Sequence, residues 1–248
     1  MVRAWSTGVN SEPKPPDVRR LLHELQHSEA LQHQAVIGPE LDPRLALLRA
    51  WQSRRLAQTY ADLLADPQYR PACLFFLSDI YAPRDFSQRD HDAERMHAFL
   101  MRVVPAPMLQ LLTEVIRLNT LTNELDRRLA DILADQLGVT DTVTLDLYAE
   151  GYRRCANSAE RHRQIDLLLS VVAQVGEGAR LPGVGWALKL ARGPARRAGW
   201  VELYSFLERG YGVFRQIRDL PAFVGTIERR ERSILNKILA GDPNPLTG

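Results

Sequence analysis

Hydrophobic positions recur along most of this chain at the three- and four-residue spacing of amphipathic α-helices. No alternation of apolar and polar residues is bounded by hairpin turns, so the pattern predicts no β-sheet. Prolines, glycines and N-cap residues divide the pattern into segments. We therefore expect an all-α protein, a multi-helix bundle. Its helices, about nine to ten in number, are expected at 17–36, 43–66, 70–81, 87–105, 107–137, 142–156, 158–176, 183–192, 198–217 and 220–240.

The same features predict how the chain is organised. Residues 1–16 are rich in Pro and Ser, which predicts a disordered N-terminal segment. Residues 17–240 are expected to form a single all-helical domain, followed by a flexible tail at 241–248. Glycines and prolines cluster at 176–199, which makes this stretch the expected position of a subdomain hinge.

Two of the expected helical segments share sequence. Arg44–Leu64 and Arg117–Leu137 both carry the tetrapeptide RRLA, at 54–57 and at 127–130. A duplicated helical unit would produce this likeness. Two amphipathic helices rich in Ala, Arg and Leu would match by composition alone, so both explanations stay open.

Charge and composition exclude several classes of function. The 248 residues include 32 Lys and Arg against 30 Asp and Glu, a net charge of +2, so no nucleic-acid partner is expected. No apolar run is long enough for a membrane span, and the N-terminus lacks the apolar centre of a signal peptide. Cys73 and Cys155 have no CxxC neighbour, which argues against a disulfide framework and fits a cytoplasmic protein.

The densest mixture of charges lies between Cys73 and Leu100. Asp79 follows an apolar run there, and a carboxylate buried in such a run needs a partner because an unpaired buried charge is costly. We predict either an ion network that fastens two helices around Pro83 or a polar pocket beneath Tyr81 and Phe86. The candidate binding residues are Asp79, Tyr81, Arg84, Asp85, Arg89, Asp90, Glu94 and His97.

The peptide HELQH at 23–27 has the spacing of a zinc site, two histidines four residues apart on a helix. The apolar face of that helix is set by Leu21, Leu22 and Leu25, so His23 and His27 would point away from it. They are the candidate metal ligands of the chain, but the leading expectation is that the protein binds no metal and no cofactor.

Two further polar stretches have open interpretations. Asn119, Thr122 and Asp126 interrupt the leucine pattern of 107–137, either as a polar seam into the core or as a solvated flank. The basic segment 180–197 alternates cations with Trp and Leu. Such a segment is typical of a helix that covers the core, meets another subunit or lies on an anionic surface.

The run FFLSDIYAPRDFSQRD at 75–90, with Asp92 and Arg95 after it, resembles the signature of an uncharacterised bacterial all-helical family. The C-terminal stretches LYSFLERGYGVF and IERRE are similar to the same family. The resemblance spans most of the ordered chain. It implies no known activity and therefore assigns no catalytic residue.

The chain lacks a complete catalytic constellation, a phosphate-binding loop and a nucleophile elbow. The leading hypothesis is therefore a non-enzymatic helical binding or regulatory module of the bacterial cytoplasm, with a protein partner or a second copy of itself. The alternative is a metal- or cofactor-binding helical enzyme centred on His97, Glu94 and Asp90.

Overall fold

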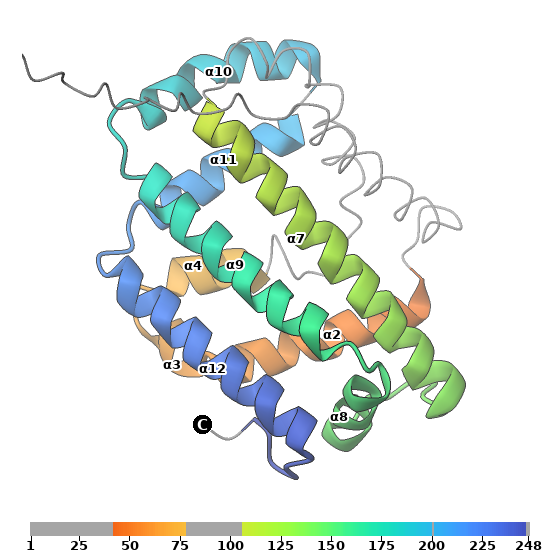
Figure 1. The fold of residues 1–248 in the computed structure, drawn as a ribbon. Coiled ribbons are helices and arrows are strands. Elements are labelled where there is room, and N and C mark those ends of the chain that lie inside the picture. The colour runs from red at the N-terminus through yellow and green to blue at the C-terminus, as the bar shows by residue number, and fades with distance from the viewer. Residues whose placement is uncertain (1–41, 78–105, 200, 247–248) are drawn as a thin grey trace, which may run out of the picture.

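A computed structural model describes residues 42–77, 106–199 and 201–246. Every regular element in these ranges is helical, which confirms the all-α fold (Figure 1). The α-helices are α2 Pro43–Thr59, α3 Ala61–Ala65, α4 Arg70–Phe75, α7 Ala106–Asp131, α8 Leu145–Arg154, α9 Ser158–Gly178, α10 Val184–Ala198, α11 Val201–Phe214 and α12 Leu220–Ala240, and the π-helical segment η2 Ile132–Gln136 follows α7. The expected segments 1–16, 17–36 and 87–105 lie outside the described residues.

Capping explains where several helices begin. The Asp42 carboxylate accepts the amide of Arg44 at 2.9 Å, and Pro43 occupies the first helical position of α2. In the same way, the Asp219 carboxylate accepts the amide of Ala222 at the start of α12. The Asp42-Pro43 pair is the signal from which the sequence predicted the start of α2.

The helix expected over 43–66 is interrupted at Tyr60. Its backbone, at φ −111° and ψ 25°, departs from helical geometry between α2 and α3. Its hydroxyl donates a 2.8 Å hydrogen bond to Glu231 on α12. The interruption thus coincides with a contact to a distant helix, which local sequence signals do not encode.

Helix α10 continues to Ala198, beyond the expected end at residue 192. Pro194 lacks the amide that would bond the Leu190 carbonyl. The Leu190 side of the helix is exposed, where water can bind that carbonyl instead. Gly199, at φ +80°, then ends the helix in the left-handed conformation that glycine adopts without strain.

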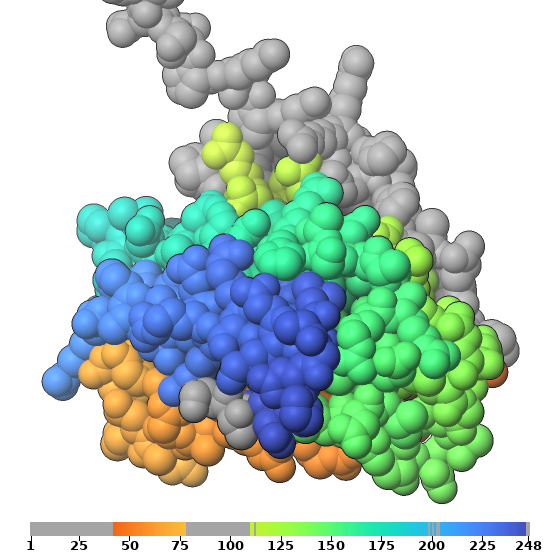
Figure 2. Space-filling view, turned by 60° about the horizontal axis from the view of Figure 1, so that its bottom comes forward, coloured from red at the N-terminus to blue at the C-terminus, as the bar shows by residue number. Residues whose placement is uncertain are grey.

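Three long helices form the body of the molecule. Helix α9 packs between α7 and α12, and α2 packs against α7 on the other side of the bundle (Figure 1). Helix α8 and the C-terminal end of α12 lie at one end of the bundle, whereas α10 lies at the opposite end. In Figure 2, α12 (dark blue) lies near the centre of one face, with the green segment that includes α8 and α9 beside it and the orange segment of α2 to α4 along the lower edge. None of the described helices combines the length and apolarity that a bilayer span requires.

The core consists of two clusters of buried side chains. The first joins α2, α7, α8 and α12 around Leu48, Leu129, Tyr148 and Ile238. Trp51 stacks on Tyr148 in this cluster, with ring centroids 4.1 Å apart.

The second cluster joins α4, α9, α11 and α12. At its centre Phe75, Phe214 and Phe223 pack with Val172, and Phe75 meets Phe206 at a centroid distance of 5.2 Å. Two adjacent cores leave a boundary between them, and the polar residues described below lie along that boundary.

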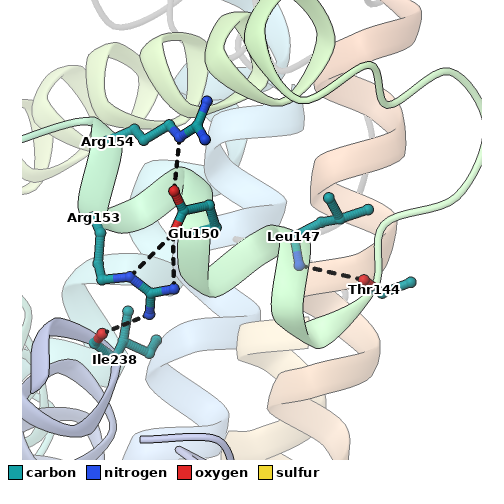
Figure 3. A network of polar contacts seen from close by, with 6 residues as sticks. All are labelled: Thr144, Leu147, Glu150, Arg153, Arg154 and Ile238. Carbon is teal, nitrogen blue, oxygen red and sulfur yellow. Dashed lines mark hydrogen bonds and ion pairs between the residues drawn. The ribbon is translucent and has the colours of Figure 1, made fainter. Parts of the chain in front are cut away.

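Polar contacts fix α8 against the end of α12 (Figure 3). Thr144 caps α8 by accepting the amide of Leu147. Arg153 bonds the Glu150 carboxylate at 2.9 Å and donates to the carbonyl of Ile238 at 3.1 Å. The last contact joins α8 to the final turns of α12, and so holds in place the tyrosines that α8 carries into the interior.

A buried polar cavity as the candidate binding site

The residues that the sequence singled out for binding lie outside the described ranges. These are Asp79, Tyr81, Arg84, Asp85, Arg89, Asp90, Glu94 and His97, together with the candidate metal ligands His23 and His27. The ion network, the pocket and the metal-centred alternative therefore stay predictions.

A cavity of about 110 Å³ lies at the boundary of the two cores. It is lined by side chains from α2, α3, α4, α7, α8, α9 and α12, mostly apolar ones. Its apolar walls draw on both clusters, with Ile234 and Ile238 from the first and Ile227 and Phe223 from the second. Five polar side chains in the wall form what we call the cavity cluster: Gln52, Arg55, Asp126, Arg161 and Glu231.

One half of the cavity cluster is an ion pair between α2 and α12. Arg55 Nη1 lies 2.9 and 3.1 Å from the two carboxylate oxygens of Glu231. The side chains are only 10% and 14% exposed. Burial works against the charged form of Arg55, but the Glu231 carboxylate raises the pKa of the guanidinium above its usual value. Arg55 therefore carries its charge inside the protein.

The other half joins α2, α7 and α9. Gln52 Nε2 donates to Asp126 Oδ1 at 3.1 Å, and Arg161 Nη1 lies 3.8 Å from the same oxygen. Arg161 also donates to the Leu125 carbonyl at 3.0 Å, and its guanidinium lies 4.3 Å from the centre of the Tyr152 ring. A guanidinium over an aromatic face is attracted to it, so Arg161 is held from three sides.

This half decides between the two alternatives for the polar residues of 107–137. Asn123 and Asp126 are buried, and Thr122 accepts a 2.9 Å hydrogen bond from Gln164 of α9. The seam enters the core, and the alternative of a solvated flank is wrong at these positions.

The cavity cluster contains hydrogen-bonding atoms that the protein does not use. Arg55 Nε, Arg161 Nε and Gln52 Oε1 are buried and have no hydrogen-bond partner within the described part of the chain. Each such atom is costly, because it has lost its contact with water and gained nothing in return. All three atoms belong to side chains that line the cavity.

Two other groups of the cavity wall are held in their neutral forms. Burial raises the pKa of Tyr148 well above its ordinary value. Burial, with Asp62 nearby, raises the pKa of the Cys73 thiol to about 11. Cys73 is therefore protonated near neutral pH and is a poor nucleophile. Within the described ranges, no group of three or more His, Cys, Asp or Glu side chains is placed to hold a metal ion.

Sequence reasoning did not single out Gln52, Arg55, Arg161 or Glu231. A signal for part of the set was present, because Gln52 falls in the buried stripe of α2 that also holds Leu45 and Leu48. A polar residue in an apolar stripe indicates a buried polar contact. Its partner on another helix is fixed only by the folded arrangement.

The fold and the cavity define this molecule as an all-helical protein with a polar site inside its core. The chain belongs to the family described as "Domain of unknown function (DUF8198)", which matches residues 30–245. No curated protein and no solved structure matches the chain. The run FFLSDIYAPRDFSQRD at 75–90 lies within the matched residues.

Proposed function

We propose that this protein is a non-enzymatic binding module whose interior cavity takes up a small neutral polar molecule. The observation that carries the proposal is the set of three unpaired atoms on the cavity cluster. Two of them, Arg55 Nε and Arg161 Nε, are hydrogen-bond donors, and the third, Gln52 Oε1, is an acceptor. A matching molecule presents acceptor oxygens to the arginines and an N–H or O–H group to Gln52.

The charge of the cavity cluster favours a neutral ligand. Two guanidiniums face two carboxylates there, so the formal charges cancel. An ion added to this buried site would bring a charge without a counter-ion, at a cost of several kcal/mol. A neutral carbonyl compound completes the hydrogen bonds without that cost.

The size and the walls of the cavity narrow the chemistry further. A cavity of about 150 Å³ holds a benzene molecule, so about 110 Å³ limits the ligand to a compound no larger than benzene, with at most about six non-hydrogen atoms. Leu168, Ile165 and Ile227 offer apolar contacts on the remaining sides. Small amides and lactams combine an acceptor, a donor and a short apolar portion.

Each charged side chain of the cavity cluster already pairs with an opposite charge. This pairing supports a binding function over a catalytic one. Free, buried thiols at Cys73 and Cys155 support the part of the proposal that assigns the protein to a reducing compartment such as the bacterial cytoplasm. Stoichiometric iron, zinc or haem in the purified protein would instead favour the alternative enzyme centred on His97, Glu94 and Asp90.

The test uses 2-pyrrolidinone as the probe and cyclopentane as its apolar counterpart, each titrated into the full chain and followed by amide NMR. We expect saturable shifts at Gln52, Arg55 and Arg161 with the lactam, with a Kd of about 1 mM, or roughly −4 kcal/mol. Cyclopentane should bind more weakly, because it leaves the polar atoms unpaired.

Leu168→Phe fills the cavity and should abolish the shifts, whereas Leu207→Phe on the exposed side of α11 should leave them unchanged. Both variants are first compared with the parent protein by circular dichroism. The proposal is overturned if the lactam produces no saturable shift in the folded parent protein, or if Leu168→Phe binds it equally well.

A further inference from the structure

Helix α10 presents an apolar pair of side chains to solvent. Trp186 is 70% exposed and Leu190 is 57% exposed, and they lie four residues apart on one side of the helix. Leu181, just before the helix, is also exposed. The helix lies at the end of the bundle opposite α8 (Figure 1). Together these exposed apolar side chains form a candidate interaction surface.

The same helix carries a concentration of positive charge. Lys189, Arg192, Arg196 and Arg197 are all exposed, and none forms an ion pair with another described residue. The 24 residues 178–201 hold five of the 32 basic residues and none of the 30 acidic ones, which leaves 27 against 30, or −3, on the rest of the chain. The basic character of the protein is therefore localised at α10.

We propose that α10 docks the protein onto an anionic lipid bilayer surface. Cations close to such a surface are attracted to its negative headgroups, and a tryptophan ring is well accommodated at the boundary between headgroups and acyl chains. Trp186 and Leu190 supply the apolar insertion, and Lys189 and Arg197 lie on the same exposed side to meet the headgroups. The proposal is independent of the cavity.

Charge argues against a second copy of the chain as the occupant of this face. A symmetric dimer through α10 would bring the same cations together across the interface, and like charges in contact are repulsive. A lipid surface carries the opposite charge, and it receives an exposed tryptophan without a shaped pocket. The experiment below distinguishes an anionic lipid surface from an acidic protein partner.

The experiment measures sedimentation of the full chain with phosphatidylcholine vesicles, with and without phosphatidylglycerol. We expect binding only to the anionic vesicles, weaker at high salt. Lys189→Glu/Arg192→Glu should lower the partition coefficient at least about 25-fold, since each cation near the surface contributes about fivefold. Trp186→Ala/Leu190→Ala should lower it about tenfold or more. Arg54→Glu/Arg163→Glu makes the same change in net charge on α2 and α9, away from α10, and should have little effect.

Circular dichroism establishes that each variant is folded before binding is compared. Absence of binding to anionic vesicles overturns the proposal, and so does binding that neither α10 variant weakens. Binding to poly-glutamate without binding to anionic vesicles also overturns it, in favour of an acidic protein partner.

Discussion

Removing the negative charge of Glu231 tests the electrostatic description of the cavity cluster. In Glu231→Gln the side chain keeps its shape and one acceptor oxygen, but Arg55 loses its counter-ion. Because the two side chains are only 10% and 14% exposed, water replaces the carboxylate poorly. We expect the variant to fold and to be markedly less stable than the parent protein.

The structure sets the size of this loss. Two unit charges about 4 Å apart attract each other by about 4 kcal/mol at the effective dielectric constant of a protein near 20. Breaking a buried ion pair by removing one partner costs about 3 to 5 kcal/mol. The retained amide oxygen can still accept from Tyr60 or Arg55, so we expect the lower part of this range, about 3 kcal/mol.

Urea unfolding followed by circular dichroism measures the free energy of unfolding. The matched control is Asp166→Asn, which breaks the exposed pair of Arg232 and Asp166, whose side chains are 36% and 59% exposed. We expect that control to cost less than about 1 kcal/mol. Arg55→Met/Glu231→Leu removes both buried charges together and should cost less than Glu231→Gln alone, because no unpaired charge remains.

A Glu231→Gln variant that loses no more stability than Asp166→Asn would contradict the buried ion pair. A double variant that is less stable than Glu231→Gln would contradict it as well. Either result would mean that water or another group solvates Arg55 inside the folded protein.

Three further predictions concern the rest of the fold. The hydrogen bond from Arg230 lowers the pKa of Asp62 to about 2 from 3.8, so the stability of this pair is present above about pH 4 and is lost as the pH falls toward 2. Asp62→Asn should therefore lower the free energy of unfolding at neutral pH, by at most about 1 kcal/mol because Asp62 is 60% exposed. The difference from the parent protein should shrink as the pH falls from 4 and disappear below about pH 2. Ala156 has φ +49°, a strained value for a residue with a Cβ. Ala156→Gly should therefore raise the free energy of unfolding by up to about 1 kcal/mol. A lower free energy of unfolding in this variant would show that the backbone at Ala156 is not strained. Cys73 should react with a thiol reagent slowly at pH 7 and faster as the pH approaches 11, whereas fast labelling at pH 7 would show an accessible thiolate.

Much of the fold follows from local signals that the sequence displays. Asp42 and Asp219 cap two helices that the sequence predicted, and a proline follows each cap within two residues. Such signals act over three or four residues, so they can be read without knowledge of the fold. The break at Tyr60 was missed because it accompanies a contact with Glu231, which lies on another helix.

The cavity cluster was less accessible to prediction for the same reason. Asp126 was recognised as polar within a leucine pattern, but its partners Gln52 and Arg161 come from helices far away in the sequence. Arg161 stands near the start of α9 in a stretch rich in charged residues, where an exposed position is the ordinary expectation. Its burial follows from the packing of α9 between α7 and α12.

The most direct test of the proposed function is a high-resolution crystal structure of the full chain grown with 2-pyrrolidinone. We expect the lactam in the cavity, with its oxygen within hydrogen-bond distance of Arg55 Nε or Arg161 Nε and its N–H directed at Gln52 Oε1. A cavity that holds only ordered water, with those three atoms bonded to it, would overturn the proposed function.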